Sequence, residues 1–96
     1  FGHQVVAHLT DKCNSIDTNI VDGEDVPTRH FGVILNFSQW KTLKKSLESK
    51  EIEFLIKPCI RFERLKGEQR TMFIKDPSDN VLEFKTFKDD TMIFEF

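Results

Sequence analysis

The sequence predicts one small domain of the α+β class. Residues 38–50 carry Trp40, Leu43 and Leu47 at spacings of three and four, which is the buried stripe of an amphipathic helix. Four segments that suit strands surround this helix, residues 29–36 before it and 51–64, 69–75 and 80–87 after it. The length of 96 residues fits a single domain. One helix among several strands defines the α+β class.

The first predicted strand and the helix follow one another closely. Residues 29–36 include the apolar run Phe31-Gly32-Val33-Ile34-Leu35, which favours a strand. Ser38 is the expected N-cap of the helix, because a serine oxygen can accept a bond from a free backbone N–H group. The solvated face of the helix carries Lys41, Lys44, Lys45 and Glu48.

The three later strands come after the helix. Residues 51–64 alternate Ile52, Phe54 and Ile56, and we expect Pro58 to interrupt that strand. Residues 65–68 form a turn, and residues 69–75 and 80–87 are the last two strands. The turn between them is Asp76-Pro77-Ser78-Asp79-Asn80, where proline fixes φ and Asp and Asn tolerate left-handed geometry.

Composition excludes several classes of partner. Fourteen basic and 16 acidic residues give a net charge of −2, and no basic stripe is present, so we expect no nucleic acid partner. No long apolar run and no signal peptide is visible, so we expect no membrane contact and a cytoplasmic location. Cys13 and Cys59 stand in unrelated contexts and are expected to be free thiols.

Glu83 is the residue that most needs an explanation. It stands among apolar neighbours in the last strand, where a carboxylate is costly unless something pairs with it. His30 heads the first strand, 53 residues upstream (83 − 30), so only the fold could join the two. Two plainer interpretations stay open: His30 as an ordinary surface residue, and Glu83 in a buried ion pair with Arg61 or Arg70.

Three segments together resemble a known superfamily. They are Phe1-Gly2-His3-Gln4-Val5-Val6-Ala7-His8-Leu9, Arg29-His30-Phe31-Gly32-Val33, and Asn80-Val81-Leu82-Glu83-Phe84-Lys85 at the end of an Asp-Pro-x-x-Asn-x-x-Glu-Phe motif. The chain resembles the vicinal oxygen chelate superfamily of glyoxalase I, fosfomycin resistance proteins, bleomycin-binding proteins and extradiol dioxygenases. It looks most similar to the small group described as predicted extradiol-dioxygenase-like proteins.

The resemblance implies βαβββ modules whose curled mixed sheet forms a cleft. Residues 1–9 would be the last strand of a first module that is largely absent from this chain, and residues 10–28 a linker. Residues 29–88 would be a complete second module, and residues 89–96 a C-terminal tail. A strand without the rest of its module leaves an open edge, so we expect a homodimer.

The resemblance also implies a metal-dependent enzyme. The family's ligands lie on the first and fourth strands of a module, which here carry His30 and Glu83. The metal would be divalent, Fe(II) first, with Mn(II), Zn(II) or Ni(II) as alternatives, and a small substrate would chelate it through two neighbouring oxygens. His8 would move protons as the catalytic residue.

The substrate contacts are expected from Arg61, Arg70 and Phe73. The two arginines would hold negative charge, and Phe73 stands where catechol-cleaving relatives carry a Tyr, which counts against catechol cleavage. Val6 occupies the position equivalent to Glu83 in the first module, so one protein ligand is missing there. The alternatives are a metal-free small-ligand binding module of the bleomycin-resistance type and a scaffold without activity.

Overall fold

The computed structural model describes residues 2, 4, 18–21, 24–27 and 29–93. Its elements in chain order are β1 (Thr18–Val21), β2 (Glu24–Pro27), β3 (Phe31–Ile34), α1 (Phe37–Ser49), β4 (Phe54–Arg61), β5 (Gln69–Lys75), β6 (Val81–Phe87) and the short 3-10 helix η1 (Asp90–Met92). His8 and Cys13 lie outside the described residues, as does almost all of the predicted strand over residues 1–9.

Four strands form a mixed sheet in the order β3-β6-β5-β4. The pair β3–β6 is parallel, and the pairs β5–β6 and β4–β5 are antiparallel. The helix α1 connects β3 to β4, so β3, α1, β4, β5 and β6 make one strand-helix-strand-strand-strand unit. This arrangement confirms the predicted α+β class and places the first and last strands of the unit side by side.

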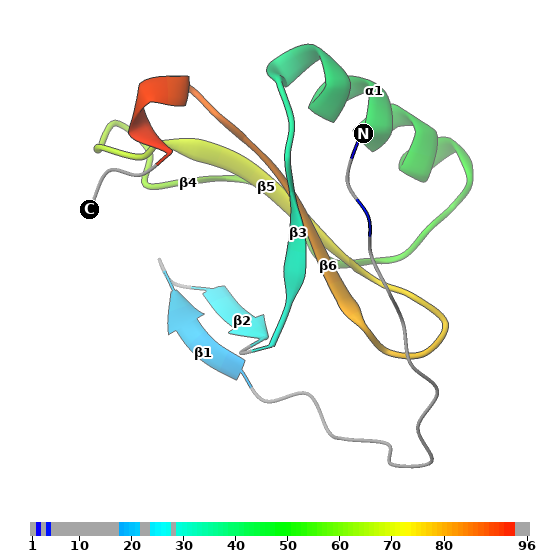
Figure 1. The fold of residues 1–96 in the computed structure, drawn as a ribbon. Helices are drawn as coiled ribbons and strands as arrows, with labels where there is room; N and C mark the ends of the chain where they lie inside the picture. The colour runs from blue at the N-terminus through cyan, green and yellow to red at the C-terminus, as the bar shows by residue number, and fades with distance from the viewer. Residues whose placement is uncertain (1, 3, 5–17, 22–23, 28, 94–96) are drawn as a thin grey trace.

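A separate two-stranded hairpin occupies part of the segment interpreted as a linker. Strands β1 and β2 pair antiparallel from Thr18 opposite Pro27 to Val21 opposite Glu24. Ile20, Val21 and Val26 are β-branched residues that favour strands, although polar neighbours conceal the pattern. Figure 1 shows the hairpin and α1 on opposite sides of the sheet.

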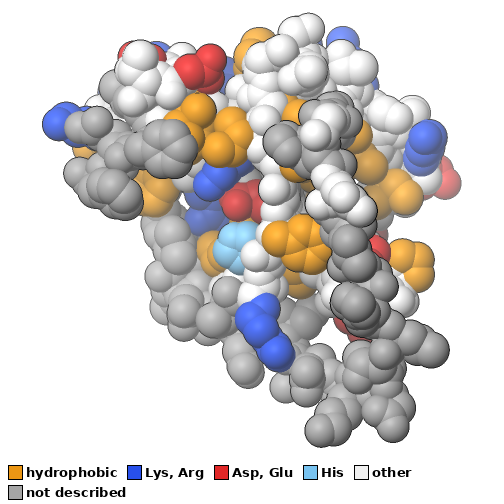
Figure 2. All heavy atoms as spheres, viewed as in Figure 1, with side chains coloured by type: hydrophobic (Ala, Val, Ile, Leu, Met, Phe, Trp, Pro, Cys, Tyr) orange, Lys and Arg blue, Asp and Glu red, His pale blue; other side chains and the backbone are white. Residues whose placement is uncertain are grey.

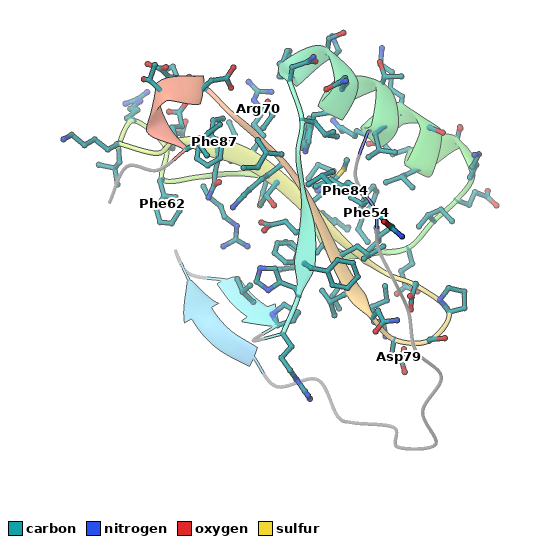
Figure 3. The ribbon with its side chains drawn as sticks, in the orientation of Figure 1. Phe54, Phe62, Arg70, Asp79, Phe84 and Phe87 are labelled. Carbon is teal, nitrogen blue, oxygen red and sulfur yellow. The ribbon has the colours of Figure 1, made fainter. Side chains whose placement is uncertain are left out.

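The helix packs on one face of the sheet through a first apolar core. Leu35, Trp40 and Met72 are buried there. The indole Nε1 of Trp40 donates a hydrogen bond of 2.9 Å to the backbone oxygen of Phe84, which ties the helix to β6. The residues that pack around this core include Leu43, Leu47, Phe54 and Phe84, and Figure 3 shows the last two between the sheet and the helix.

The helix begins one residue earlier than predicted, and Ser38 is not its cap. Asn36 is the N-cap: its Oδ1 accepts a 2.8 Å bond from the backbone N–H of Gln39. The side-chain oxygen of Gln39 in turn accepts a 3.1 Å bond from the backbone N–H of Asn36. This reciprocal capping box makes Asn36 the better cap, because it satisfies two backbone donors together.

Strand β4 continues through Pro58, so the predicted interruption is wrong. The register between β4 and β5 shifts between Ile56 and Cys59, on either side of the proline. β4 lies at an edge of the sheet, where a missing backbone N–H group removes no bond from a second neighbour. An edge position and a bulge together accommodate the proline.

The turn between β5 and β6 forms as predicted around the Asp76 carboxylate. Its Oδ1 accepts bonds from the backbone N–H groups of Ser78 and Asn80, at 2.9 and 2.8 Å. The side-chain amide of Asn80 donates to Oδ2 at 2.8 Å. Asp79 adopts a positive φ of 63°, which Asp tolerates better than most residues.

The second face of the sheet, opposite the helix, carries a smaller apolar core. Val26 from the hairpin packs there with Ile56, Phe73 and Val81. The strand alternation that places Phe73 and Val81 on this face also places Glu83 and Lys85 on it. Among the described residues, no helix has the length and apolar character needed to cross a membrane.

Candidate metal centre

The structure brings together the two residues that the sequence analysis paired. The His30 Nε2 atom lies 3.5 Å from the Glu83 Oε1 atom. His30 immediately precedes β3, and the parallel register sets Gly32 of β3 opposite Glu83 at the centre of β6. Alternation then directs the side chains of residues 30 and 83 to the same face of the sheet.

The tautomer of His30 follows from its second nitrogen. Nδ1 lies 2.8 Å from the backbone oxygen of Pro27, and a carbonyl oxygen can only accept. Nδ1 therefore carries the proton and donates, which leaves Nε2 facing the carboxylate. Nε2 then either carries a second proton or presents a lone pair to an anionic oxygen. A cation or a water molecule that donates to both atoms would satisfy the second arrangement.

Two further side chains hold the Glu83 carboxylate. The hydroxyl of Thr71, fully buried on β5, donates a 2.6 Å hydrogen bond to Glu83 Oε2. The Lys85 Nζ atom lies 3.8 Å from Oε1. Each carboxylate oxygen therefore has a partner, which explains how an acidic residue with 9% of its surface exposed is tolerated here.

Sequence reasoning missed both Thr71 and Lys85. Lys85 could have been found, because it stands two residues after Glu83 and so lies on the same face of a strand. Thr71 could not, because its place depends on the register of β5 against β6. That register pairs Thr71 with Lys85 and Phe73 with Glu83.

Gly32 allows β3 to approach β6 beside the pair. A Cβ atom built on Gly32 would overlap the backbone carbonyl of Glu83. A glycine at this place is therefore a steric requirement of the β3–β6 contact. The same contact sets the distance between His30 and Glu83.

Phe73 and Arg61 lie beside the pair, as the sequence analysis expected for substrate-binding residues. The Phe73 ring meets the His30 ring edge-on, with 5.1 Å between centroids and 69° between planes. The Arg61 guanidinium carbon lies 5.8 Å from the centre of the Phe73 ring, and Arg61 is only 3% exposed. Figure 2 shows a histidine next to acidic and basic side chains, with hydrophobic side chains around them.

Arg70 is not part of this group. It lies between Gln69 and Thr71 in β5, so alternation directs it to the helix-covered face. Its guanidinium carbon lies 4.9 Å from the centre of the Phe37 ring, at the start of α1. Figure 3 shows Arg70 at the opposite end of the sheet from Asp79. Arg61 and Arg70 therefore lie on opposite faces of the sheet and do not face one substrate group together as had been predicted.

The pair fits one divalent metal ion but does not complete a site. Two ligand atoms that each lie about 2.0–2.2 Å from one ion are about 3–3.5 Å apart, and the measured 3.5 Å agrees with this separation. Imidazole with carboxylate is the donor set of iron, manganese, zinc and nickel sites. Within the described residues, however, no group of three His, Cys, Asp or Glu side chains could hold a metal ion.

An open hollow elsewhere on the molecule has a different character. It is lined by Arg64, Leu65, Lys66, Glu68, Lys88, Asp89 and Asp90. Two of its charged side chains pair with each other: Lys88 Nζ lies 3.6 Å from Glu68 Oε2. None of the residues predicted for the site lines this hollow.

A comparison with solved structures defines the class of protein. The fold matches the crystal structure of a glyoxalase/bleomycin resistance protein/dioxygenase from Alicyclobacillus acidocaldarius, with a TM-score of 0.71 and 34% sequence identity. The match covers 90% of this chain and 61% of that chain. No protein-family model and no curated protein matches the sequence.

This match supports the vicinal oxygen chelate superfamily, which the motifs of the sequence also indicated. The strand-helix-strand-strand-strand unit over β3–β6 is one βαβββ module of that superfamily. Because the chain spans 61% of the length of the matched protein, the match also agrees with the expectation that a first module is largely absent from these 96 residues.

Proposed function

We propose that this module holds a divalent metal ion between His30 and Glu83 and acts on a small substrate that presents two neighbouring oxygens. The observation that carries the proposal is the 3.5 Å approach of His30 Nε2 to Glu83 Oε1. The donating Nδ1 of His30 supports it, because that bond leaves Nε2 free to bind a cation. Fe(II) is the first candidate, with Mn(II), Zn(II) and Ni(II) as alternatives.

The side chains around the pair have separate roles in this proposal. The Pro27 carbonyl and the Thr71 hydroxyl fix the orientation of the two ligands. Phe73, 1% exposed, forms an apolar wall that excludes water, and Arg61 beside it holds negative charge on the substrate. A bound divalent ion supplies Lewis acidity toward the substrate oxygens. The role of His8 as a proton carrier stays a prediction, since His8 lies outside the described residues.

Two reaction classes of the superfamily are compatible with a metal ion at His30 and Glu83. An extradiol-type dioxygenase reaction fits the two-residue donor set, and a glyoxalase-type reaction is the other option. Phe73 has no phenol to orient a catechol, which favours substrates other than simple catechols. A third ligand would come from a residue outside the described ranges or from a partner chain, in line with the predicted homodimer.

A metal-free binding module is the second candidate function. One observation favours it: Lys85 already neutralises Glu83, and within the described residues no third ligand adjoins the pair. In that case the same face binds a small ligand through Phe73 and Arg61 without catalysis.

Metal titration separates the two candidates. We expect the protein to bind Fe(II) or Mn(II) without oxygen in a calorimetric titration, and elemental analysis to find the ion in purified protein. His30→Ala and Glu83→Gln should each weaken metal affinity by at least about 10–100-fold, because each removes one of two described ligands. The circular dichroism spectrum should stay unchanged.

Glu48→Gln is the matched control for the loss of one carboxylate. Glu48 lies on the exposed face of α1, 3.9 Å from Lys44. The metal affinity of the Glu48→Gln protein should equal that of the wild type. Metal binding that survives both His30→Ala and Glu83→Gln would place the metal elsewhere, and a wild type that binds neither ion would leave the binding module as the function.

A further inference from the structure

Lys85 occupies an unusual place for a residue beside a proposed metal ligand. Its Nζ atom lies 3.8 Å from Glu83 Oε1, the same oxygen that faces His30 Nε2. An ammonium ion beside this oxygen and a divalent metal ion bound to it repel each other, because like charges at such separations interact unfavourably. Metal binding therefore favours the displacement of Lys85 from Glu83.

The surroundings of Lys85 limit where its charge can go. Nζ also lies 5.6 Å from the centre of the Phe87 ring, on the side away from Glu83 along β6. The side chain is 29% exposed, so it keeps room to move without leaving the face. After displacement, the Lys85 ammonium group thus stays close to His30 and Glu83 but no longer pairs with the Glu83 carboxylate.

A second cation and a buried acceptor extend the same face. Arg61 of β4 lies directly opposite Gln69 of β5, one residue pair beyond the Thr71–Lys85 pair by strand alternation. Gln69 is 8% exposed, and within the described part of the chain its Oε1 has no hydrogen-bond partner. A buried amide oxygen without a donor favours a ligand that brings an O–H or N–H group.

The charges give the expected ligand class. Lys85 contributes one positive charge and Glu83 one negative charge, so the charges of these two side chains sum to zero. A divalent ion raises the sum to +2 at these residues. A dianion compensates such a site better than a monoanion, because one anionic group meets the metal and another meets Lys85.

We propose that Lys85 exchanges partners: it neutralises Glu83 in the metal-free protein and binds a second anionic group, a carboxylate of the ligand, once a metal ion displaces it. This inference rests on the proposed function, since it requires a metal ion at His30 and Glu83. It names the ligand class as a small dianion with one metal-chelating end. It also couples the two binding events, because the metal frees the cation that the ligand needs.

Lys85→Met tests this exchange through two effects of opposite sign. Titration with Mn(II) without oxygen should show metal affinity raised about threefold to tenfold, because a competing cation is removed. The Mn(II)-loaded protein is then titrated with lactate and with malate, which share an α-hydroxycarboxylate end and differ in one carboxylate. The wild type should prefer malate by at least about tenfold, and Lys85→Met should bring the ratio near one.

Two controls separate the exchange from a general charge effect. Lys85→Arg keeps the positive charge and should keep the malate preference. Lys75→Met removes a lysine at the other end of the strand pair, where Nζ lies 3.7 Å from Asp79, and should match the wild type in both titrations. Thr71 of β5 lies opposite Lys85 of β6. Lys75 is four residues further along β5, about 13 Å away, and therefore lies outside the site.

The outcomes distinguish a failure of the proposed metal site from a failure of the Lys85 exchange alone. A wild type that fails to bind Mn(II) overturns the proposed function and the exchange together. Normal Mn(II) binding with unchanged affinity in Lys85→Met overturns the exchange alone, as does a malate preference that persists in Lys85→Met. Should Lys85→Met fail to fold, Lys85→Gln carries the same two expectations.

Discussion

Thr71 is the residue whose replacement gives the clearest test of how Glu83 is held. Its hydroxyl donates the 2.6 Å bond to Glu83 Oε2 and is fully buried. Thr71→Val keeps the shape and removes the donor, which leaves a buried carboxylate oxygen without a partner. We expect a loss of about 1–3 kcal/mol in the free energy of unfolding and about a tenfold weaker metal affinity. Urea unfolding and Mn(II) titration measure the two effects.

Thr71→Ser provides the comparison for that experiment. Serine keeps the hydroxyl and loses a methyl group, so metal affinity should stay close to that of the wild type. A Thr71→Val protein with normal metal affinity would show that the bond to Oε2 does not orient the ligand.

Individual residues of the site were predictable to different degrees. His30 and Glu83 could be paired because a carboxylate in an apolar strand demands a partner and the motif supplied one. Arg61 and Arg70 looked equivalent in the sequence, nine residues apart, yet strand alternation sends Arg70 to the helix side over Phe37. Nothing in the sequence reveals the register that brings Thr71 to Glu83.

At the scale of elements, the contact of β3 with β6 makes Gly32 the position most sensitive to substitution. A methyl group there overlaps the Glu83 carbonyl, so Gly32→Ala must push the strands apart. We expect a cost of about 1–3 kcal/mol or more in stability. Metal affinity should also fall, because the displacement moves His30 away from Glu83. Thermal unfolding together with Mn(II) titration measures both.

Gly67→Ala separates strand displacement from ordinary glycine strain. Gly67 has a φ of 78°, but a Cβ there meets no described atom within 4 Å. Its replacement should cost about 1 kcal/mol through backbone strain alone, with metal affinity unchanged. If Gly32→Ala behaved in the same way, the close approach of β3 to β6 would not control the site.

The elements from β3 to β6 were predicted in the right order, and the errors in the predicted elements have physical causes. The helix boundary moved by one residue because Asn36 and Ser38 are both cap-forming residues, and only Asn36 has Gln39 three positions later. Pro58 suggested a break because its effect depends on whether the strand lies at an edge. The hairpin β1–β2 was hidden by charged neighbours around its β-branched residues.

At the scale of the whole molecule, three carboxyl groups outside the core contribute to how stability responds to acid. The Asn80 side chain and the backbone N–H groups of Asn80 and Ser78 hold the pKa of Asp76 below its usual range. The backbone N–H of Arg64 lowers the pKa of Glu68, and the hydroxyl and N–H of Thr91 lower the pKa of Asp89. Each group favours folding only while it is ionised.

The direction of the pH effect follows from these lowered values. The unfolded chain takes up protons at its carboxyl groups near pH 4, while the folded protein resists until lower pH. The stabilisation from these three carboxylates is fully present above the pKa values of the unfolded chain. It is lost as the pH falls through the pKa values of the folded protein. We expect the triple variant Glu68→Gln/Asp76→Asn/Asp89→Asn to show a flatter decline than the wild type between pH 5 and 2.5, in urea unfolding. Parallel curves would contradict this assignment.

The parallel pairing of β3 with β6 joins the first and last strands of the module, so the His30–Glu83 contact closes a loop that contains α1, β4 and β5. We expect such a contact to form late in folding, because the entropy of closing a long loop is lost before any bond compensates for it. An ion bound at both residues would stabilise the entire module against unfolding. Its release would accompany global unfolding rather than local fraying. Any substitution that loosens the helix or the distant turn would then appear in a titration as a weaker metal site. Measured affinities of variants therefore have to be read against the unfolding free energy of each one.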